Sequence, residues 1–490
     1  MKRIVDAFGE LSWGKRAYAA FVVCVTTAMA LPGQTLTTRH SFNSTDGLWP
    51  FAGLVQGTDG NLYGTTYYGG TAPNCAGESS PCGTIFKITP AGTLTSLHNF
   101  DGTDGANPQG GLVLGADGSF YGTTFYDGEH GGGTIFKITA SGALTTLYSL
   151  GFFPIGSGPE SALIQATDGS FYGTTIQGFG TILEFNPGGA VTTFYSFSGT
   201  GGNFPQGSLV EGIDGNFYGT TEYGGNSTAC PSSDHPGCGT IFKITPSGAL
   251  TTLHTFDFTD GAYPEAALMQ AIDGNLYGTT SNGGSTTCFG STNGCGTVFE
   301  ITPSGTLTVL HTFEDYYSDG AYPSGRLLQA TDGNLYGTNG GGVMGGGTIF
   351  KISPSGNLTT VYNLGTPPGP LGPVAGLVQA TNGIFYGTTL EGGTSTACYE
   401  GCGTVFSLSV GLGPFVRTQP IFGKAGAAIK ILGTDLAGTT SVSFNGTPAS
   451  FSVVSATEIM TTVPLGAITG YLNVVTPSGT LSSGGPFFVR

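Results

Sequence analysis

The sequence predicts an all-β fold, a seven-bladed β-propeller closed by an N-terminal strand and followed by an immunoglobulin-like β-sandwich. Three observations predict it. The eight-residue pattern DGNLYGTT occurs in seven copies with small variations, and a second pattern, GT-[IV]-[FL], follows each of them. A strand-like segment stands alone before the first copy, and the last copy lacks the matching segment.

The repeat has the length of a propeller blade. Its tyrosines lie 46 to 59 residues apart, which fits a four-stranded unit and is much longer than most coils of an open β-solenoid, the alternative architecture. Seven copies therefore predict seven blades. The copies begin at Asp59, Asp117, Asp168, Asp214, Asp273, Asp332 and Asn382.

Residues 111–150 illustrate the four strands. GLVLGA is a short apolar run, SFYGTTFY follows an Asp-Gly turn, GTIFKIT is a third strand, and ALTTLYSL follows a Ser-Gly turn. Tight glycine turns between such runs are typical of an antiparallel meander. The tight turns all fall at one end of the blade. The longer loops fall at the other end, which we call the loop-rich face, and there we expect any binding site.

The two ends of the repeat region predict closure. TLTTRHSF at 35–42 resembles TLTSLHNF at 93–100, the fourth strand of the first copy, whereas the last copy stops at 403–410 without a fourth strand. We expect 36–42 to lie beside 404–408, because a closed ring leaves no exposed sheet edge.

Residues 1–30 read as a cleaved signal peptide, which predicts a secreted or cell-surface protein. Lys2, Arg3, Lys15 and Arg16 precede an apolar run that ends in Ala28-Met29-Ala30, the arrangement of a secretory signal. The alternative is a membrane anchor, but about fourteen apolar residues are few for a spanning helix. Without residues 1–30 the chain has 10 basic and 28 acidic residues, a net charge of −18, which disfavours nucleic acid and anionic membranes as partners.

Eight cysteines form four close pairs, each in the long loop of one copy. Two cysteines per copy are too few for a zinc site, and local disulfides suit an exported protein. The predicted pairs are Cys75–Cys82, Cys230–Cys238, Cys288–Cys295 and Cys398–Cys402.

Tyrosines and aspartates on the loop-rich face are the candidate ligand-binding residues. Exposed tyrosine beside a polar group suits stacking against sugars or apolar peptide groups, although these rings could equally anchor loops. The aspartates stand in TDG or SDG turns, where an Asx-type turn is the plainer interpretation and binding of Ca²⁺ or ligand hydroxyls the alternative. The candidates are Tyr67, Tyr68, Tyr126, Tyr223, Tyr263, Tyr322, Asp104, Asp260 and Asp319.

Histidines recur at one position of the fourth strand, where Tyr148, Tyr195 and Tyr362 stand in other copies. At a position that accepts histidine or tyrosine, we expect the ring to pack against its neighbours and the polar atom at its end to form a hydrogen bond. The four histidines are His40, His98, His254 and His311.

No catalytic residue is predicted, because the nucleophile-elbow, zincin, phosphate-loop and dinucleotide patterns are all missing from the sequence. We expect no cofactor and no metal. The sequence favours a non-enzymatic scaffold that binds an extracellular glycan or protein through the loop-rich face. The alternatives are a polysaccharide lyase or glycosidase acting at the propeller pore, and a structural envelope protein without a ligand. Oligomeric state is left open.

Two resemblances add to this. The motifs DGNLYGTT, GTIFKITP and GTLTSLHNF, within about residues 31–410, are similar to the GloVer tandem-repeat family of exported bacterial proteins, named after Gloeobacter and Verrucomicrobia. The C-terminal piece, residues 411–490 with its match near 414–490, resembles the immunoglobulin-like IPT/TIG domain through IKILGTDL, VSFNGTPA, FSVVSATEIMTTVP and GYLNVVTPSG. The first resemblance implies export and a surface role, and the second a spacer or adhesion unit.

Overall fold

The computed structural model describes residues 34–72, 82–151, 156–199, 201–230, 235–285, 288, 293–342, 345–365 and 368–490. Every regular element in these ranges is a β-strand, as the sequence predicts. The same ranges contain no helix long and apolar enough to cross a membrane. The predicted signal peptide, residues 1–30, lies outside them.

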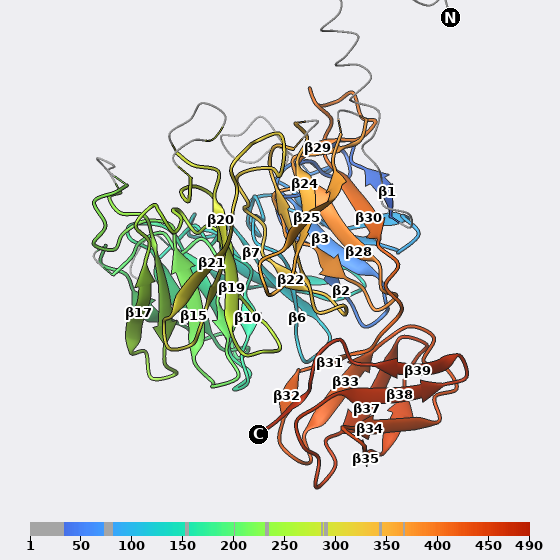
Figure 1. The fold of residues 1–490 in the computed structure, drawn as a ribbon. Helices are drawn as coiled ribbons and strands as arrows, with labels where there is room; N and C mark the ends of the chain where they lie inside the picture. The colour runs from blue at the N-terminus through green and yellow to red at the C-terminus, as the bar shows by residue number, and fades with distance from the viewer. Residues whose placement is uncertain are drawn as a thin grey trace, which may run out of the picture.

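Each of the first six copies of the repeat forms its own four-stranded antiparallel sheet, with the strands in chain order (Figure 1). The first sheet has β2 (Val55–Gln56), β3 (Leu62–Thr66), β4 (Thr84–Ile88) and β5 (Leu94–Asn99). The second has β6 (Val113–Leu114), β7 (Phe120–Thr124), β8 (Thr134–Ile138) and β9 (Leu144–Ser149). The third has β10 (Ile164–Gln165), β11 (Phe171–Thr175), β12 (Thr181–Phe185) and β13 (Val191–Ser196).

The next three sheets have the same form. The fourth contains β14 (Val210–Glu211), β15 (Phe217–Thr221), β16 (Thr240–Ile244) and β17 (Leu250–Thr255). The fifth contains β18 (Met269–Gln270), β19 (Leu276–Thr280), β20 (Thr297–Ile301) and β21 (Leu307–Thr312). The sixth contains β22 (Leu328–Gln329), β23 (Leu335–Asn339), β24 (Thr348–Ile352) and β25 (Leu358–Asn363).

The last copy takes its fourth strand from the N-terminal end of the described chain. Its sheet combines β27 (Val378–Gln379), β28 (Phe385–Thr389) and β30 (Thr404–Ser409) with β1 (Thr35–Ser41). β1 runs antiparallel to β30, with Thr35 opposite Ser409 and Ser41 opposite Thr404. This is the pairing expected from the sequence. A short ribbon of β26 (Pro370–Leu371) and β29 (Glu391–Gly392) accompanies this copy.

The recurring aspartate and tyrosine bind each other. Asp59 Oδ1 accepts the Asn61 backbone N–H at 3.1 Å, which holds the Asp-Gly turn, and its Oδ2 accepts the Tyr63 hydroxyl at 2.8 Å. The Tyr63 ring is fully buried, so its hydroxyl needs such a partner. The same tyrosine–aspartate bond recurs in the next five copies, and Asn382 replaces the aspartate in the last.

The recurring glycine and threonines are explained by packing within the sheet. A Cβ on Gly64 would lie 2.6 Å from the Phe86 ring, so the position has no room for a side chain. The hydroxyls of Thr66 and Thr84 lie 2.8 Å apart in the buried part of the sheet and link the second strand to the third. These contacts are the reason that DGxxYGTT and GT-[IV] recur together.

Hydrophobic cores lie between neighbouring sheets. Tyr63 of the first sheet stacks on Phe120 of the second at 4.0 Å, within a buried cluster that both sheets share. Six further clusters join the other neighbouring pairs. One of them joins Phe42 and Val405 of the last sheet to Leu62 of the first.

Side chains also form hydrogen bonds between neighbouring sheets, near the first strand of each sheet. The Ala116 N–H donates to Gln165 Oε1 of the next sheet at 2.8 Å, and four later junctions repeat this bond with a glutamine or Glu211. The Thr381 N–H of the last sheet donates in the same way to Gln56 of the first at 3.1 Å. The second sheet has Leu114 at this position, which cannot accept a hydrogen bond.

The C-terminal residues form a sandwich around their own buried cluster. One sheet has the order β31-β33-β37-β36, and the other β35-β34-β38-β39, with β32 and β40 as a separate parallel pair. The strands are β31 (Arg417–Gln419), β32 (Phe422–Gly423), β33 (Ala428–Leu432), β34 (Ser441–Phe444), β35 (Thr447–Pro448), β36 (Phe451–Val453), β37 (Glu458–Thr462), β38 (Leu472–Thr476), β39 (Gly479–Ser482) and β40 (Phe488–Val489).

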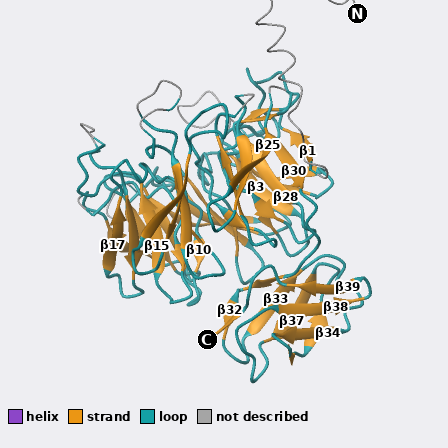
Figure 2. Cartoon of the chain, in the orientation of Figure 1, coloured by secondary structure: helices purple, strands orange, loops and turns teal. Residues whose placement is uncertain are grey.

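The sandwich packs against the turn end of the repeat region, opposite the long loops (Figures 1 and 2). Gln419 Nε2 donates to the Leu114 carbonyl at 2.5 Å, at the copy that lacks the bridging glutamine. Arg417 donates to the Gln56 carbonyl at 2.9 Å, and Thr457 to the Thr58 carbonyl at 2.7 Å. Through these bonds the C-terminal sandwich contacts the first two sheets.

Candidate site at the loop-rich end

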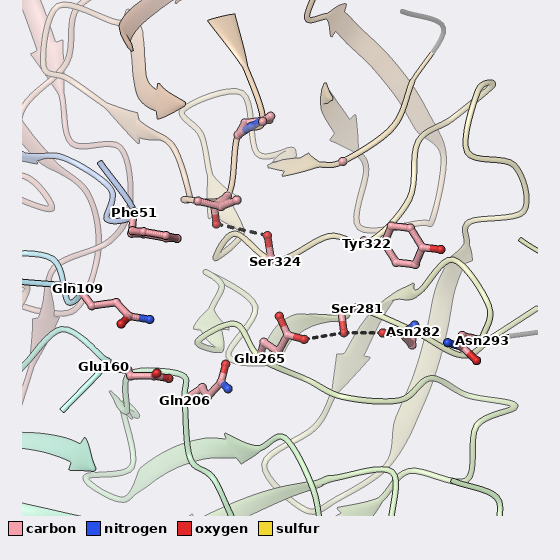
Figure 3. Close-up of a pocket in the computed structure, with 14 residues that line it drawn as sticks. Phe51, Gln109, Glu160, Gln206, Glu265, Ser281, Asn282, Asn293, Tyr322 and Ser324 are labelled. Atoms are coloured by element: carbon pink, nitrogen blue, oxygen red, sulfur yellow. Dashed lines mark hydrogen bonds between the residues drawn. The ribbon is translucent and has the colours of Figure 1, made fainter. Parts of the chain in front are cut away.

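One position of the repeat lines a single cavity at the loop-rich end of the sheets. This position directly follows the proline that precedes the first strand of each copy, so each of the seven copies contributes one residue. The cavity has a volume of about 750 Å³, within the range of small-ligand sites. We call it the mouth cavity (Figure 3). The seven residues are Phe51, Gln109, Glu160, Gln206, Glu265, Ser324 and Val374.

The residue before each proline has a left-handed backbone. Trp49, Phe204 and Tyr263 have φ of 56°, 56° and 57°, values that bulky side chains rarely adopt. The same conformation occurs at Asn107 and Tyr322 and at two glycines. This strained turn therefore recurs in every copy, and in each copy it lies two residues before the cavity-lining residue.

Three carboxyl groups gather on one side of the mouth cavity. Glu160 and Glu265 belong to the seven lining positions, whereas Glu222 directly follows the threonine pair of the fourth copy and is buried. Gln206 Nε2 donates to Glu222 Oε2 at 2.6 Å. The Ser281 hydroxyl donates to Glu265 Oε1 at 2.9 Å. Figure 3 shows Glu160, Gln206 and Glu265 next to one another around the cavity.

Burial raises the pKa of all three carboxyl groups. It raises the pKa of Glu160 to about 7, with a further contribution from the negative charge of Glu265. It raises the pKa of Glu222 to about 7, with Glu265 and Glu160 adding to the effect. The pKa of Glu265 is also raised by burial, against the hydrogen bond from Ser281. All three carboxyl groups therefore accept a proton more readily than an exposed glutamate does.

This arrangement can bind a ligand rich in hydroxyl groups. Carboxylates and amide oxygens accept hydrogen bonds, whereas carboxylic acids, amide nitrogens and hydroxyls donate them. Phe51 and Tyr322 add two aromatic rings to the wall. Among the residues that the structure describes, no group of three or more His, Cys, Asp and Glu side chains could hold a metal ion.

The predicted tyrosines are placed unequally around this cavity. Tyr322 lines it. Tyr263 and Tyr223 contact each other, with ring centroids 5.3 Å apart, and Tyr223 also stacks on His235.

The remaining tyrosines pack against other aromatic rings of the loop-rich end. The Tyr67 ring lies 5.2 Å from that of Phe51, a lining residue, and Tyr68 packs against Tyr67 at 4.6 Å. Tyr126 contacts Phe125 and remains 46% exposed. Of the predicted tyrosines, Tyr322 is thus part of the mouth cavity itself, and Tyr67 supports its wall.

The predicted aspartates pair with the recurring histidines. Asp104 Oδ2 lies 2.6 Å from His98 Nε2, and Asp260 Oδ2 lies 2.7 Å from His254 Nε2. Asp319 and His311 form the same pair at 3.0 Å. Asp104 and Asp260 also accept a backbone N–H within their own turns. The histidine position therefore combines packing with a polar tip, as the sequence predicts.

Three of the predicted disulfides are present. Cys230–Cys238, Cys288–Cys295 and Cys398–Cys402 are bonded, each within the loop of one copy. Cys75 lies outside the described residues, so the pair that it was predicted to form with Cys82 is not placed.

Sequence reasoning missed the carboxyl groups of the mouth cavity. A signal for two of them exists: the residue after the junction proline is Phe, Gln, Ser or Val in five copies but acidic at Glu160 and Glu265. Glu222 stands where other copies have Tyr67 or Leu390.

The fold and the mouth cavity define an all-β chain of propeller-like sheets, with a cavity lined by carboxyl, amide and aromatic side chains and a C-terminal immunoglobulin-like domain. The chain belongs to the Gloeobacter/Verrucomicrobia repeat family, whose model matches residues 24–178, 74–289 and 285–447. An IPT/TIG domain matches residues 416–489. Both findings agree with the resemblances in the sequence.

Two solved structures are similar to the chain at low sequence identity, and the first of them shares its fold. A fungal alcohol oxidase of the AA5 family, solved in complex with copper, is 14% identical, with a TM-score of 0.52 over 94% of this chain and 99% of that chain. A luciferin-regenerating enzyme is 12% identical, with a TM-score of 0.39 over 78% of this chain and 98% of that chain. No curated protein matches the sequence. The likeness to the oxidase extends over both the sheets and the C-terminal domain.

Proposed function

We propose that the chain is a closed seven-bladed β-propeller, exported or held at the cell surface, that binds a glycan in its mouth cavity. The observation that carries this proposal is the convergence of one repeat position from all seven copies on that cavity. Hydrogen-bonding side chains of both kinds suit the hydroxyl groups of a sugar, and aromatic rings suit its apolar face.

Closure and blade number are supported by the contacts between the first and last sheets. The last sheet includes β1, and the Thr388 hydroxyl donates to the Ala52 carbonyl of the first sheet at 3.0 Å. The cluster around Phe42 joins the same two sheets. Seven sheets with such contacts at every junction fit a ring, and a ring places the seven lining residues around its pore.

Export is supported by the disulfides and by the sequence of residues 1–30. Structural disulfides form in oxidising compartments, and three are present in the long loops. IPT/TIG domains fit the same setting. An extracellular protein partner remains the alternative ligand, and an envelope protein without any ligand is the outcome if nothing binds.

The test is a glycan array followed by calorimetry on the chain from residue 31. Gln206→Ala removes the amide beside Glu222, and we expect it to weaken binding about tenfold, the effect of one lost hydrogen bond. Glu129→Ala is the matched control, since Glu129 is exposed in a loop outside the cavity. If the wild-type chain binds no glycan, the proposal fails. If Tyr67→Ala and Tyr68→Ala abolish binding while Gln206→Ala does not, the site lies on the aromatic loops instead.

A second candidate function is hydrolysis or elimination of a glycan at the same cavity. Carboxyl groups with a pKa near 7 can act as general acid or base at neutral pH, and Glu160 and Glu222 have this property. An assay of polysaccharide cleavage across pH 5 to 9 tests it. Activity that survives in Glu160→Gln and Glu222→Gln would contradict this assignment. The copper named for the similar oxidase is a property of that protein and is not carried over to this chain.

A further inference from the structure

A second cavity, of about 600 Å³, is lined by the first strands of the second to fourth sheets, by Arg326 of the sixth copy and by the C-terminal sandwich. We call it the interdomain cavity. Its walls include Val113, Ile164 and Leu209 from the sheets and Ile421 and Phe422 from the sandwich. It shares no lining residue with the mouth cavity. Most of this wall is apolar, so a ligand here would bury an apolar body.

Arg326 breaks the repeat pattern at this cavity. It is the third residue after the junction proline, where the other copies have only small residues. In this acidic chain a long cationic side chain therefore stands at a position that six copies keep nearly empty. The six are Gly53, Gly111, Ala162, Ser208, Ala267 and Gly376.

The guanidinium of Arg326 is available to a ligand. Among the described residues it forms no ion pair and no hydrogen bond. Its side chain lines the cavity and is exposed to water, and arginine stays protonated at neutral pH. An anion can therefore bind it without breaking an existing ion pair of the described residues.

The other charges around the interdomain cavity leave a positive excess. Lys424 lines the cavity and is exposed. Arg490 and Glu211 also line it, but they lie 3.6 Å apart and compensate each other, and Glu211 accepts two further bonds from Thr167. Arg326 and Lys424 therefore remain as two cationic groups beside an apolar wall.

We propose that the interdomain cavity binds a small organic anion with an apolar body, whose acidic head is held by Arg326 and Lys424. A carboxylate and a phosphate share the required chemistry, since each accepts paired hydrogen bonds from a guanidinium. Ile421 and Phe422 contact the apolar body from the C-terminal side, so the ligand also strengthens the contact between the sandwich and the sheets. This site is independent of the proposed glycan site.

The experiment measures binding by calorimetry and by the shift in melting temperature of the full chain. The probes are decanoate, decyl phosphate, decanol and acetate. We expect decanoate or decyl phosphate, or both, to bind and to raise the melting temperature, and the response to each identifies the head group. Decanol lacks the charge and acetate lacks the apolar body, so both are expected to bind at least tenfold more weakly.

Arg326→Met is expected to weaken binding about tenfold to a hundredfold, the effect of a lost charged hydrogen bond. Lys351→Met is the matched control, because Lys351 lies on β24 of the same sheet and does not line the cavity. Lys424→Met tests the second cationic position of the site if Arg326→Met fails to fold. Equal binding of decanol, no binding of either anion, or unchanged binding in both folded arginine and lysine variants would overturn the proposal.

Discussion

His98 Nε2 lies 2.6 Å from Asp104 Oδ2, and this pair connects the last strand of the first sheet to the turn that leads into the second. The same relationship recurs between His254 and Asp260. In each turn the second carboxylate oxygen accepts a backbone N–H from the residue three positions earlier. One aspartate thus holds both the strand end and the turn.

Loss of such an aspartate should destabilise the fold. Asp260→Ala removes the partner of His254 and the acceptor of the Asp257 N–H. We expect the free energy of unfolding to fall by about 1–3 kcal/mol, because two hydrogen bonds are lost. Thermal unfolding measures it, with Glu129→Ala as the exposed control. An unchanged melting temperature would show that the pair contributes nothing to stability.

Glu222 should make the stability of the fold depend on pH. Its pKa is raised in the folded chain to about 7, so the folded state binds more protons than the unfolded state between about pH 4.5 and pH 7. The free energy of unfolding should therefore fall as the pH rises through this window, by about 1–3 kcal/mol from this group. Glu222→Gln should flatten the dependence and stabilise the protein at pH 8. Denaturant titrations at pH 5 and pH 8 measure both effects, and a variant with the wild-type pH dependence would exclude Glu222 as its source.

The glycine of the recurring tyrosine–glycine pair should not tolerate alanine. A Cβ on Gly278 would lie 2.5 Å from Phe299 and 2.9 Å from Leu268. We expect Gly278→Ala to cost about 1–3 kcal/mol, the range for an overpacked core. Gly173→Ala is the matched control, because Leu183 replaces the phenylalanine there and a Cβ would meet only Leu163 closely. Equal losses in the two variants would mean that the aromatic contact is not the cause.

Phe42, next to β1, should be critical for joining the two ends of the repeat region. It is fully buried in the cluster shared by the last and first sheets. Phe42→Ala is expected to lower the free energy of unfolding by about 3–5 kcal/mol. Phe179→Ala should change it by less than about 1 kcal/mol, since this ring is 52% exposed. Chemical denaturation compares them, and a small loss for Phe42→Ala would argue against tight packing at this junction.

The sequence predicts the sheets well because their determinants are local. The Asp59–Tyr63 hydrogen bond and the Thr66–Thr84 hydrogen bond both form within one copy. The residues that determine each sheet therefore lie in the sequence of that copy. Strand lengths are less well predicted: the apolar run GLVLGA forms a strand only at Val113–Leu114. This strand pairs with one neighbour, β7, over two residues.

The candidate site could not be predicted in the same way. Glu160 and Glu265 belong to different copies, and only the arrangement of the sheets brings them to one cavity. Burial raises the pKa of both, and the charge of Glu265 adds to the effect at Glu160, which no single copy shows. Arg326 stands out only when the seven copies are placed side by side.

β1 lies against β30, so the earliest-made strand of the repeat region completes a sheet whose other strands are made last. Since synthesis runs from the amino end, this segment stays without its hydrogen-bonding partner until nearly all of the repeats have emerged, and long-range pairing of this kind is slow. Thr35–Ser41 is therefore expected to stay unpaired longer than the other strands of the repeat region.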